Sequence, residues 1–339
     1  MLQTKQSSKL DFDLVADFKH GYRNREDVTN LPQGVLVVGS QNVVTNTSNR
    51  VGVVTGYALD GAASTELAAI SSSYDFLTNL NTTRNLRAYL DPATSHAVLQ
   101  YRYDSSGTIT WRDLITTTAA LHSAAFNFTD YWDTTEIKSL MLFVNGETNV
   151  YQWNGGITTI LSVGTNTLTK NGTNTWQQDG FYTTRDKKVV IAGVEYTYTG
   201  GETTTTLTGV TPDPAVAAPA IAVGAICHQQ YVVTATTPTA TFKNDLIASL
   251  RNQVYYGSLT SRNVYVSKIN EFDDVGFTSP TRVVGEGALL YLDASAVALV
   301  PQEDRMYISA GKDHWYETKF TLSSDLTKES FEIKKLKTA

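Results

Sequence analysis

The chain has 339 residues, of which 41% are hydrophobic, and its 27 Lys and Arg against 33 Asp and Glu give a formal net charge of −6. This length suffices for one large core or for two domains. The negative balance disfavours proteins that hold nucleic acid or anionic lipid through a general positive field. No stretch approaches about 18 uninterrupted apolar residues, so we expect no membrane-spanning segment.

The first residues and the single cysteine indicate the compartment in which the chain is made. The opening MLQTKQSSKLDFD lacks the apolar core of a signal peptide, and Cys227 lies in the apolar run AIAVGAIC. A lone cysteine cannot form an internal disulfide, which is typical of proteins made in a reducing cytosol. We interpret Cys227 as a buried, unreactive thiol.

Alternating apolar residues and turn residues dominate the first part of the chain. The segments GVLVV (34–38), NVVTN (42–46) and RVGVVTGYAL (50–59) predict strands separated by short polar turns. Further strands are expected on both sides of a Ser-Ser-Gly turn ending at Gly107. They are also expected around Asn145-Gly146, a strong hairpin signal because both residues tolerate positive φ.

The composition changes near Thr165, where Thr, Gly and Asn become frequent. Strand candidates follow at 188–191, 194–199 and 203–208, and then a Pro-rich return with Pro212, Pro214 and Pro219. We therefore expect residues 165–222 to form a separable β insert with a Pro-rich return linker. Four aromatic residues are expected to make its small core rather than a contact with a neighbour: Trp176, Phe181, Tyr196 and Tyr198.

The last third of the chain repeats a short apolar phrase. Val254-Tyr255-Tyr256 and Val264-Tyr265-Val266 are ten residues apart and predict two adjacent strands. A strand, turn and strand are also expected around Ala310-Gly311-Lys312-Asp313. Helical spacing is scarce, and where it occurs, at Phe242, Leu246 and Leu250, it fits a strand equally well.

Strand spacing indicates the architecture. Predicted strands that start near Val98 and Leu140 are 42 residues apart, as are those that start at Asn263 and Arg305, and this interval is the length of a propeller blade. The expected fold is all-β, a β-propeller-like core of short antiparallel hairpins with a small inserted β domain. The expected division is 1–60 for an N-terminal segment with the first strands, 61–164 and 223–339 for the core, and 165–222 for the insert. The core has room for about five blades.

Residues that carry chemistry do not form a recognisable set. The sequence contains no phosphate-binding loop and no nucleophile motif, and no two histidines have the spacing of a metal pair: His20, His96, His122, His228 and His314. The acid pairs Asp273-Asp274 and Glu303-Asp304 lie in predicted loops, where solvated carboxylates are expected. We therefore predict no enzyme, with no catalytic, cofactor-binding or metal-binding residues and no cofactor.

Two features of the sequence are compatible with a protein that binds or cleaves glycans. The segment DSSGTITW (104–111) loosely resembles the Asp-box hairpin of sialidase-type propellers, with one residue too many between Asp104 and Gly107, and such a turn lies far from catalysis. Five aromatic residues fit either a carbohydrate platform, an oligomer interface or packing between sheets, and packing is favoured: Tyr255, Tyr256, Tyr265, Trp315 and Tyr316.

The N-terminal run DFKHGYRNREDVTNLPQGVLVVGSQNVVTNTSNRVGVVTGY resembles the opening of tailed-bacteriophage proteins that form the tail nozzle, the tail hub or the head-to-tail stabilising ring. The matching residues are Leu31-Pro32-Gln33-Gly34, Asn42-Val43, Arg50-Val51 and Gly56-Tyr57. RNVYVSKINEFDDVGFTSP and VPQEDRMYISAGKDHWYET look like blade strands of the same group, and YTYTGGETTTTLTGVTPDP looks like segments of other phage virion proteins. Together these segments cover 98 of the 339 residues.

The resemblance implies a virion structural protein, a β-propeller-containing subunit of a homo-oligomeric ring, commonly six-fold, around the DNA channel. Nozzle proteins are usually longer, so an incomplete propeller, or one closed by the N-terminal segment, is the expected form. The expected partners are neighbouring tail or adaptor proteins. Genomic DNA is expected to pass during ejection without sequence-specific binding. The lumen is expected to be acidic or neutral, and the two acid pairs are candidates for residues that line it or its rim. The alternative is a glycan-binding or glycan-cleaving propeller at the host surface.

Overall fold

The computed structural model describes residues 43–45, 51–53, 70–78, 82–105, 108–116, 125–134, 138–185, 187–235, 242–276, 285–312, 314–322 and 329–336. The chain divides into two compact units, Met1–Ala63 and Ser64–Ala339. The strand expected at 34–38, the family-like residues Leu31 to Gly34 and Gly56-Tyr57, and His20 and His122 lie outside the described residues.

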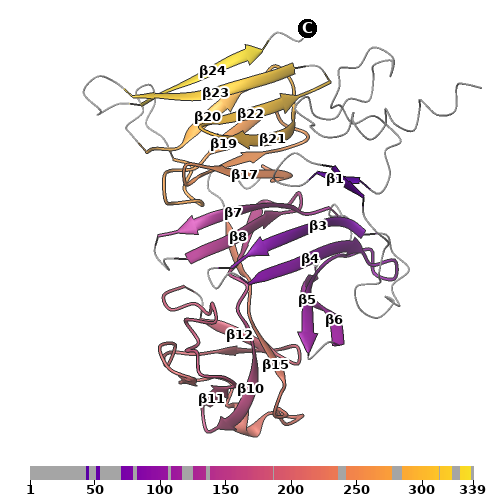
Figure 1. The fold of residues 1–339 in the computed structure, drawn as a ribbon. Helices are drawn as coiled ribbons and strands as arrows, with labels where there is room; N and C mark the ends of the chain where they lie inside the picture. The colour runs from indigo at the N-terminus through magenta and orange to yellow at the C-terminus, as the bar shows by residue number, and fades with distance from the viewer. Residues whose placement is uncertain are drawn as a thin grey trace, which may run out of the picture. The chain divides into compact units, whose positions relative to one another are not determined.

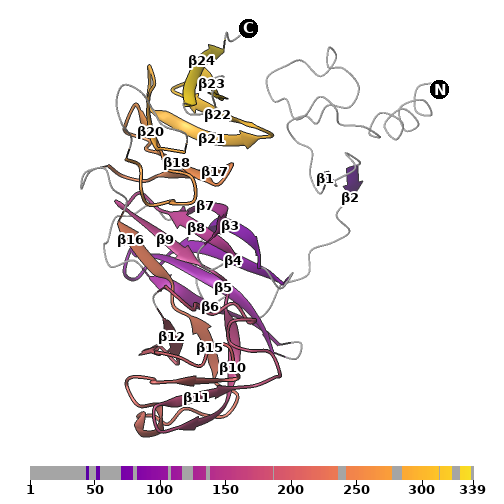
Figure 2. The ribbon, with the colours of Figure 1, turned by 90° about the vertical axis from the view of Figure 1, so that its left-hand side faces the viewer.

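In the first unit the described residues form one hairpin. β1 (Val43–Thr45) pairs antiparallel with β2 (Val51–Val53), and Val44 lies opposite Gly52 (Figure 2). The two strands lie within the segments 42–46 and 50–59 in which strands are predicted. The polar Asn-Thr-Ser-Asn stretch between them is typical of a turn.

The second unit is nearly all-β, and four of its sheets have four antiparallel strands each (Figure 1). Sheet I contains β3 (Ile70–Leu77), β4 (Thr83–Leu90), β5 (Ala97–Ser105) and β6 (Thr108–Thr116). Sheet II contains β7 (Asn127–Asp133), β8 (Lys138–Val144), β9 (Asn149–Trp153) and β16 (Val232–Ala235).

The other two follow later in the chain. Sheet III contains β17 (Leu246–Leu250), β18 (Gln253–Gly257), β19 (Asn263–Val266) and β20 (Ala288–Tyr291). Sheet IV contains β21 (Ala296–Gln302), β22 (Arg305–Ala310), β23 (His314–Leu322) and β24 (Glu329–Leu336).

In sheets I, III and IV every strand pairs with the next one along the chain, and sheet II differs only in receiving its fourth strand, β16, after an insertion. A four-stranded antiparallel meander is the unit of a propeller blade. The all-β fold class predicted from the sequence, with its antiparallel hairpins, is confirmed. The described residues contain four such sheets rather than about five.

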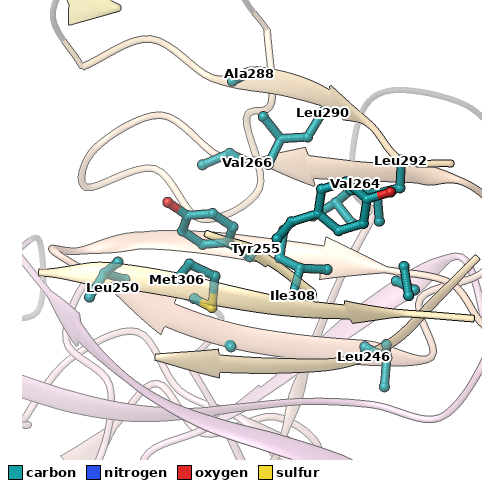
Figure 3. Close-up of a cluster of buried hydrophobic side chains, with 14 residues drawn as sticks. Leu246, Leu250, Tyr255, Val264, Val266, Ala288, Leu290, Leu292, Met306 and Ile308 are labelled. Carbon is teal, nitrogen blue, oxygen red and sulfur yellow. The ribbon is translucent and has the colours of Figure 1, made fainter. Parts of the chain in front are cut away.

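The central sheets are buried on both faces, which explains the repeated apolar phrase. Successive side chains of a strand point to opposite faces. On β18, Tyr255 packs in a cluster with Met306 and Ile308 of sheet IV (Figure 3). Val254 and Tyr256 pack in another cluster with sheet II. The two phrases lie on the paired strands β18 and β19, as predicted, with Tyr256 opposite Tyr265.

Sheets I and II share a third cluster. Its largest members are aromatic, and they come from both sheets: Phe76 and Tyr101 from sheet I, and Phe143, Tyr151 and Trp153 from sheet II. Tyr74 and Phe128 add a stacked ring pair across the same junction, with centroids 4.9 Å apart. A chain of apolar clusters therefore connects sheet I to II, II to III and III to IV.

The interval of 42 residues between predicted strand starts is not the length of one four-stranded sheet. Val98 lies in β5, the third strand of sheet I, whereas Leu140 lies in β8, the second strand of sheet II. Asn263 and Arg305 likewise belong to a third and a second strand. The interval arose because loops of unequal length separate the strands, although each pair of strands does fall in successive sheets.

The segment between β9 and β16 forms a six-stranded sheet of its own, the insert sheet. Its strands, in the order β13-β12-β15-β10-β11-β14, are β10 (Ile157–Gly164), β11 (Thr167–Lys170), β12 (Lys188–Ile191), β13 (Val194–Thr197), β14 (Thr206–Thr208) and β15 (Ile226–Gln229). Three of them lie where strands are predicted. β10 and β15 lie outside residues 165–222, so the sheet is larger than the predicted insert.

A compact apolar core holds the insert sheet. The four aromatic residues predicted for it, Trp176, Phe181, Tyr196 and Tyr198, are buried together, and that prediction is confirmed. Cys227 is buried among them, and burial raises the pKa of its thiol, so the unreactive interpretation agrees with its surroundings. The Pro-rich return contains one 3-10 turn, Pro214–Val216, which Asp213 caps through its side chain.

Candidate functional site

The described histidines are separate from one another. His96 and His314 are partly exposed, and His228 is buried beside Tyr101 with ring centroids 5.3 Å apart. Across the described ranges, no three His, Cys, Asp or Glu residues lie close enough to hold a metal ion.

The two acid pairs lie in turns, as predicted. Asp274 forms an ion pair with Lys268, and this contact lowers the pKa of the Asp274 carboxyl. Asp304 lies 3.5 Å from the Arg251 guanidinium and 3.6 Å from that of Arg305. Each pair is therefore partly neutralised by a neighbouring cation.

Four of the five aromatic candidates pack within the protein. Tyr255, Tyr256 and Tyr316 are buried, and Tyr265 contacts Phe242 edge to face with centroids 4.7 Å apart. Trp315 differs, because 39% of it is exposed. The packing interpretation therefore describes the group except Trp315.

A cavity of about 480 Å³ lies where the β6 edge of sheet I meets the insert sheet. Sheet I supplies most of its polar lining: Gln100, Tyr101, Trp111, Arg112 and Asp113. The insert sheet supplies a smaller and more apolar wall, which includes Val190, Ile226 and His228. The volume is within the range of small-molecule sites, roughly 300–1,000 Å³.

A β-bulge orients the polar wall. Leu99 pairs with Ile115 and Gln100 pairs with Asp113, so Leu114 is an extra residue in β6. The bulge places Asp113 opposite Gln100, whereas Arg112 lies opposite Tyr101 on the other face of the strand pair. Bulges often re-aim side chains beside functional sites.

A hydrogen-bonded row fixes this wall. Arg87 donates from Nε and Nη2 to Gln100 Oε1 at 2.8 and 2.7 Å, and Gln100 Nε2 donates to Asp113 Oδ1 at 2.8 Å. The Arg87 guanidinium also lies over the Trp111 ring, 4.3 Å from its centroid. Gln100 is buried, so the row is rigid and holds both Trp111 and Asp113 in place.

His228 forms the opposite wall. Its Nδ1 lies 3.1 Å from the Gln229 carbonyl oxygen, which favours the tautomer that carries its proton on Nδ1 and leaves Nε2 as an acceptor. Burial lowers the pKa of the imidazole, and the positive charge of Arg112 lowers it further. His228 is therefore neutral near pH 7.

The sequence did not predict this site. His228 was one of five histidines without the spacing of a metal pair, and no role was expected for Gln100, Trp111, Arg112 or Asp113. The consecutive Trp111-Arg112-Asp113 on a predicted strand is the signal that was present, since a strand with one solvated face seldom carries three such residues in a row. The insert sheet, which completes the cavity from residues about 80 to 130 positions away in the chain, could not be placed from sequence.

In the described part of the chain, no helix has the length and apolar character to cross a membrane. The sequence matches no protein-family model and no curated protein.

Proposed function

We propose that this chain is a non-enzymatic structural subunit of a bacteriophage tail, in the nozzle, the hub or the head-to-tail ring. It is made in the host cytoplasm and incorporated into the virion. Copies of it form a ring, six-fold as in the group that the N-terminal run resembles, around the conduit through which DNA is ejected. The propeller-like fold, which that group would share, supports the proposal.

The observation that carries this proposal is the outer face of sheet IV. Met306 and Ile308 point toward sheet III, so Tyr307 between them points the other way. Tyr307 lies opposite Val300, and Trp315 lies on the same face opposite Ser309. Val300 is 42% exposed and Trp315 is 39% exposed.

Exposed aromatic and aliphatic side chains on one sheet face favour a protein contact. Sheets I to IV already pack face against face through apolar clusters, so a further sheet of the same kind is the partner whose chemistry fits. We assign this face to a neighbouring copy of the chain in the ring.

The charges of the acid pairs fit a weakly interacting conduit. Asp274 and Asp304 each lie beside a cation, so neither turn presents a strong field to a passing duplex. A lumen without a positive field lets DNA move, because lysines and arginines facing the phosphates would hold it.

The assembly is tested by sedimentation and electron microscopy of the purified full chain, alone and with its neighbouring tail proteins. Closed rings are expected, and Trp315→Arg is expected to shift the population to smaller species. Leu259→Ser is the control, because Leu259 is equally apolar and 54% exposed but lies in the turn between β18 and β19. Monomers at every concentration and in every mixture, or rings unchanged by Trp315→Arg, would contradict the assignment.

Two assays address the rest of the proposal. Turnover of sialosides, peptidoglycan or bacterial polysaccharide by the purified protein would contradict the non-enzymatic role. Micromolar, salt-sensitive binding to duplex DNA would contradict a conduit that releases its cargo.

Glycan binding at the host surface remains a second candidate function, and the cavity beside β6 is the observation that favours it. Its rigid polar wall and its partly exposed Trp111 match what small polar ligands require. A structural subunit of a tail and a carrier of such a site are compatible roles for one chain.

A further inference from the structure

The cavity beside β6 contains a cation without a carboxylate partner. Arg112 is exposed, and among the described residues its guanidinium contacts the ring of Tyr103, 5.9 Å from the centroid, and forms no ion pair. Arg87, in contrast, is already engaged by Gln100 and lies over Trp111. Arg112 is therefore the side chain that can hold an incoming anion.

The walls around Arg112 do not compensate its charge. His228 is neutral near pH 7, and burial raises the pKa of the Tyr101 hydroxyl, so both side chains are uncharged. Asp113 is the one acid among the lining residues, and its Oδ1 accepts a hydrogen bond from Gln100. Asp113 lies on the other face of the strand pair from Arg112 and is held by Gln100, so it forms no ion pair with Arg112.

The same walls offer a hydrogen-bond acceptor and apolar surface at fixed positions. His228 Nε2 is left as an acceptor by the contact of Nδ1, and His228 lies beside Tyr101, which is opposite Arg112. Trp111, Val190 and Ile226 supply the apolar part of the lining. A ligand that fits must therefore combine a negative group, hydroxyl donors and a small apolar face.

We infer that this cavity binds a carboxylate-bearing saccharide, such as a hexuronate unit. The guanidinium of Arg112 holds the carboxylate, because its planar fork matches two carboxylate oxygens. His228 Nε2 accepts a hydrogen bond from a ring hydroxyl, and the apolar side of the sugar lies against Val190 and Ile226. A site of about 480 Å³ has room for one or two sugar units.

The inference goes beyond the assembly role and does not depend on it. Ligand binding is read from titration of the chain with a sugar, whereas assembly is read from sedimentation. The two can therefore fail separately.

Isothermal titration of the full chain with methyl β-glucuronide tests the site, with methyl β-glucoside and acetate as comparison ligands. Both comparison ligands lack one half of the proposed chemistry, since the glucoside has no carboxylate and acetate has no ring. The glucuronide is expected to bind at least about tenfold more tightly than either, as one charge-assisted contact of about 1.5–3 kcal/mol implies.

Arg112→Gln should lower the affinity for the glucuronide about tenfold or more and leave the weak binding of the glucoside unchanged. Arg251→Gln is the matched control, because Arg251 is an exposed arginine in the turn between β17 and β18, away from the cavity. Both variants should unfold at the same urea concentration as the parent, which shows that the fold is intact.

Three results would overturn the inference. One is the absence of glucuronide binding at millimolar concentration. Another is equal affinity for the glucuronide and the glucoside, or for the glucuronide and acetate. The last is an Arg112→Gln variant that binds the glucuronide as the parent does.

Discussion

Tyr255 and Tyr256 are neighbours on β18, yet their rings belong to different hydrophobic clusters, one shared with sheet IV and the other with sheet II. The Tyr256 hydroxyl donates a hydrogen bond to the Phe272 carbonyl at 2.6 Å. A single strand thus holds three sheets together.

This arrangement predicts a large effect of truncation at Tyr256. Tyr256→Ala should lower the free energy of unfolding by about 3–5 kcal/mol, because it leaves a cavity between sheets II and III. Tyr256→Phe should lower it by about 1 kcal/mol, the contribution of the hydrogen bond to Phe272. Urea unfolding measures both values. Tyr291→Ala is the control, since Tyr291 is 71% exposed, and an equal loss there would contradict the core assignment.

Two glycines of the second unit distinguish backbone strain from steric overlap. Gly201 (φ +90°) and Gly224 (φ +81°) both have a left-handed backbone. A Cβ on Gly201 would lie 2.1 Å from the Thr206 carbonyl oxygen, whereas a Cβ on Gly224 meets nothing within 4 Å. Gly224→Ala should cost about 1–2 kcal/mol from strain alone.

Gly201→Ala should cost about 1–3 kcal/mol more than Gly224→Ala, because the overlap adds to the same strain. Thermal unfolding of the two variants side by side gives the difference. Equal stabilities would show that the turn before β14 relaxes freely.

The ion pair of Lys170 and Asp179 is buried. Lys170 Nζ lies 2.6 Å from Asp179 Oδ2, and the two side chains are 1% and 15% exposed. Asp179→Ala should destabilise the protein by about 3–5 kcal/mol, because an uncompensated ammonium group remains inside. The double variant Lys170→Met with Asp179→Ala should recover more than half of that loss, as measured by urea unfolding.

An exposed pair provides the comparison. Lys188 and Glu195 lie on paired strands, with Lys188 Nζ 3.0 Å from Glu195 Oε1, but their side chains are 37% and 42% exposed. Glu195→Ala should change the free energy of unfolding by less than about 1 kcal/mol. A loss as large as that of Asp179→Ala would contradict the role given to burial.

His228 predicts a pH dependence. Burial lowers the pKa of its imidazole in the folded state, whereas the unfolded chain has the ordinary value of about 6.5. The unfolded state therefore binds more protons below that pH, and the stabilising contribution, complete above about pH 6.5, is lost as the pH falls toward the folded-state pKa.

The free energy of unfolding should accordingly decrease between pH 7.5 and pH 5, and His228→Gln should flatten that decrease. His96→Gln serves as the comparison, because His96 is only partly buried. A His228→Gln variant with the same slope as the parent would exclude His228 as the group responsible.

The insert predicted from the sequence, residues 165–222, can be removed to test whether the four sheets fold without it. Removing residues 165–222 would take away β11, β12, β13 and β14 and leave β10 and β15 behind. It would also remove Arg185, whose Nε lies 2.6 Å from the buried Asp133 of sheet II. We still expect the four sheets to fold, at reduced stability and with impaired assembly.

Removing residues 157–229 is expected to be less harmful. Val232 lies opposite Gln152, so the ends of β9 and β16 are side by side and a short Gly-Ser linker can join them as a hairpin. Combined with Asp133→Asn, this deletion should unfold in one cooperative transition. Loss of cooperativity in both deletions would show that the insert sheet belongs to the core.

Local signals in the sequence accounted for strands and turns. Asn145-Gly146 joins β8 to β9, with φ of +87° at Gly146, because a Gly at this position costs no steric strain. Leu246 to Leu250 remained ambiguous from sequence and form a strand, since both of its faces are covered by neighbouring sheets. The spacing of apolar residues along the sequence does not show that a strand is buried on both faces.

Long-range pairings were not predictable in the same way. The cavity needs β5 and β6 beside β12 and β15, and nothing in residues 100–113 specifies that approach. The bulge at Leu114 depends on register, which alternation alone does not fix when both faces carry apolar residues. The succession Trp111-Arg112-Asp113 was visible in the sequence, but the cavity that these residues line could be recognised only in the folded chain.

Sheet II has a consequence for the time order of folding. β9 and β16 are partners across the whole insert, and Gln152 reaches Thr234 over a sequence separation of 82 residues. During synthesis β9 is an open edge until the ribosome has released β16, and closing so long a loop is slow unless the loop first becomes compact. The insert sheet brings β10 and β15 together, and through them the two ends that sheet II must join. We therefore expect the insert sheet to fold before β16 pairs with β9, and sheet II to be completed only after that step.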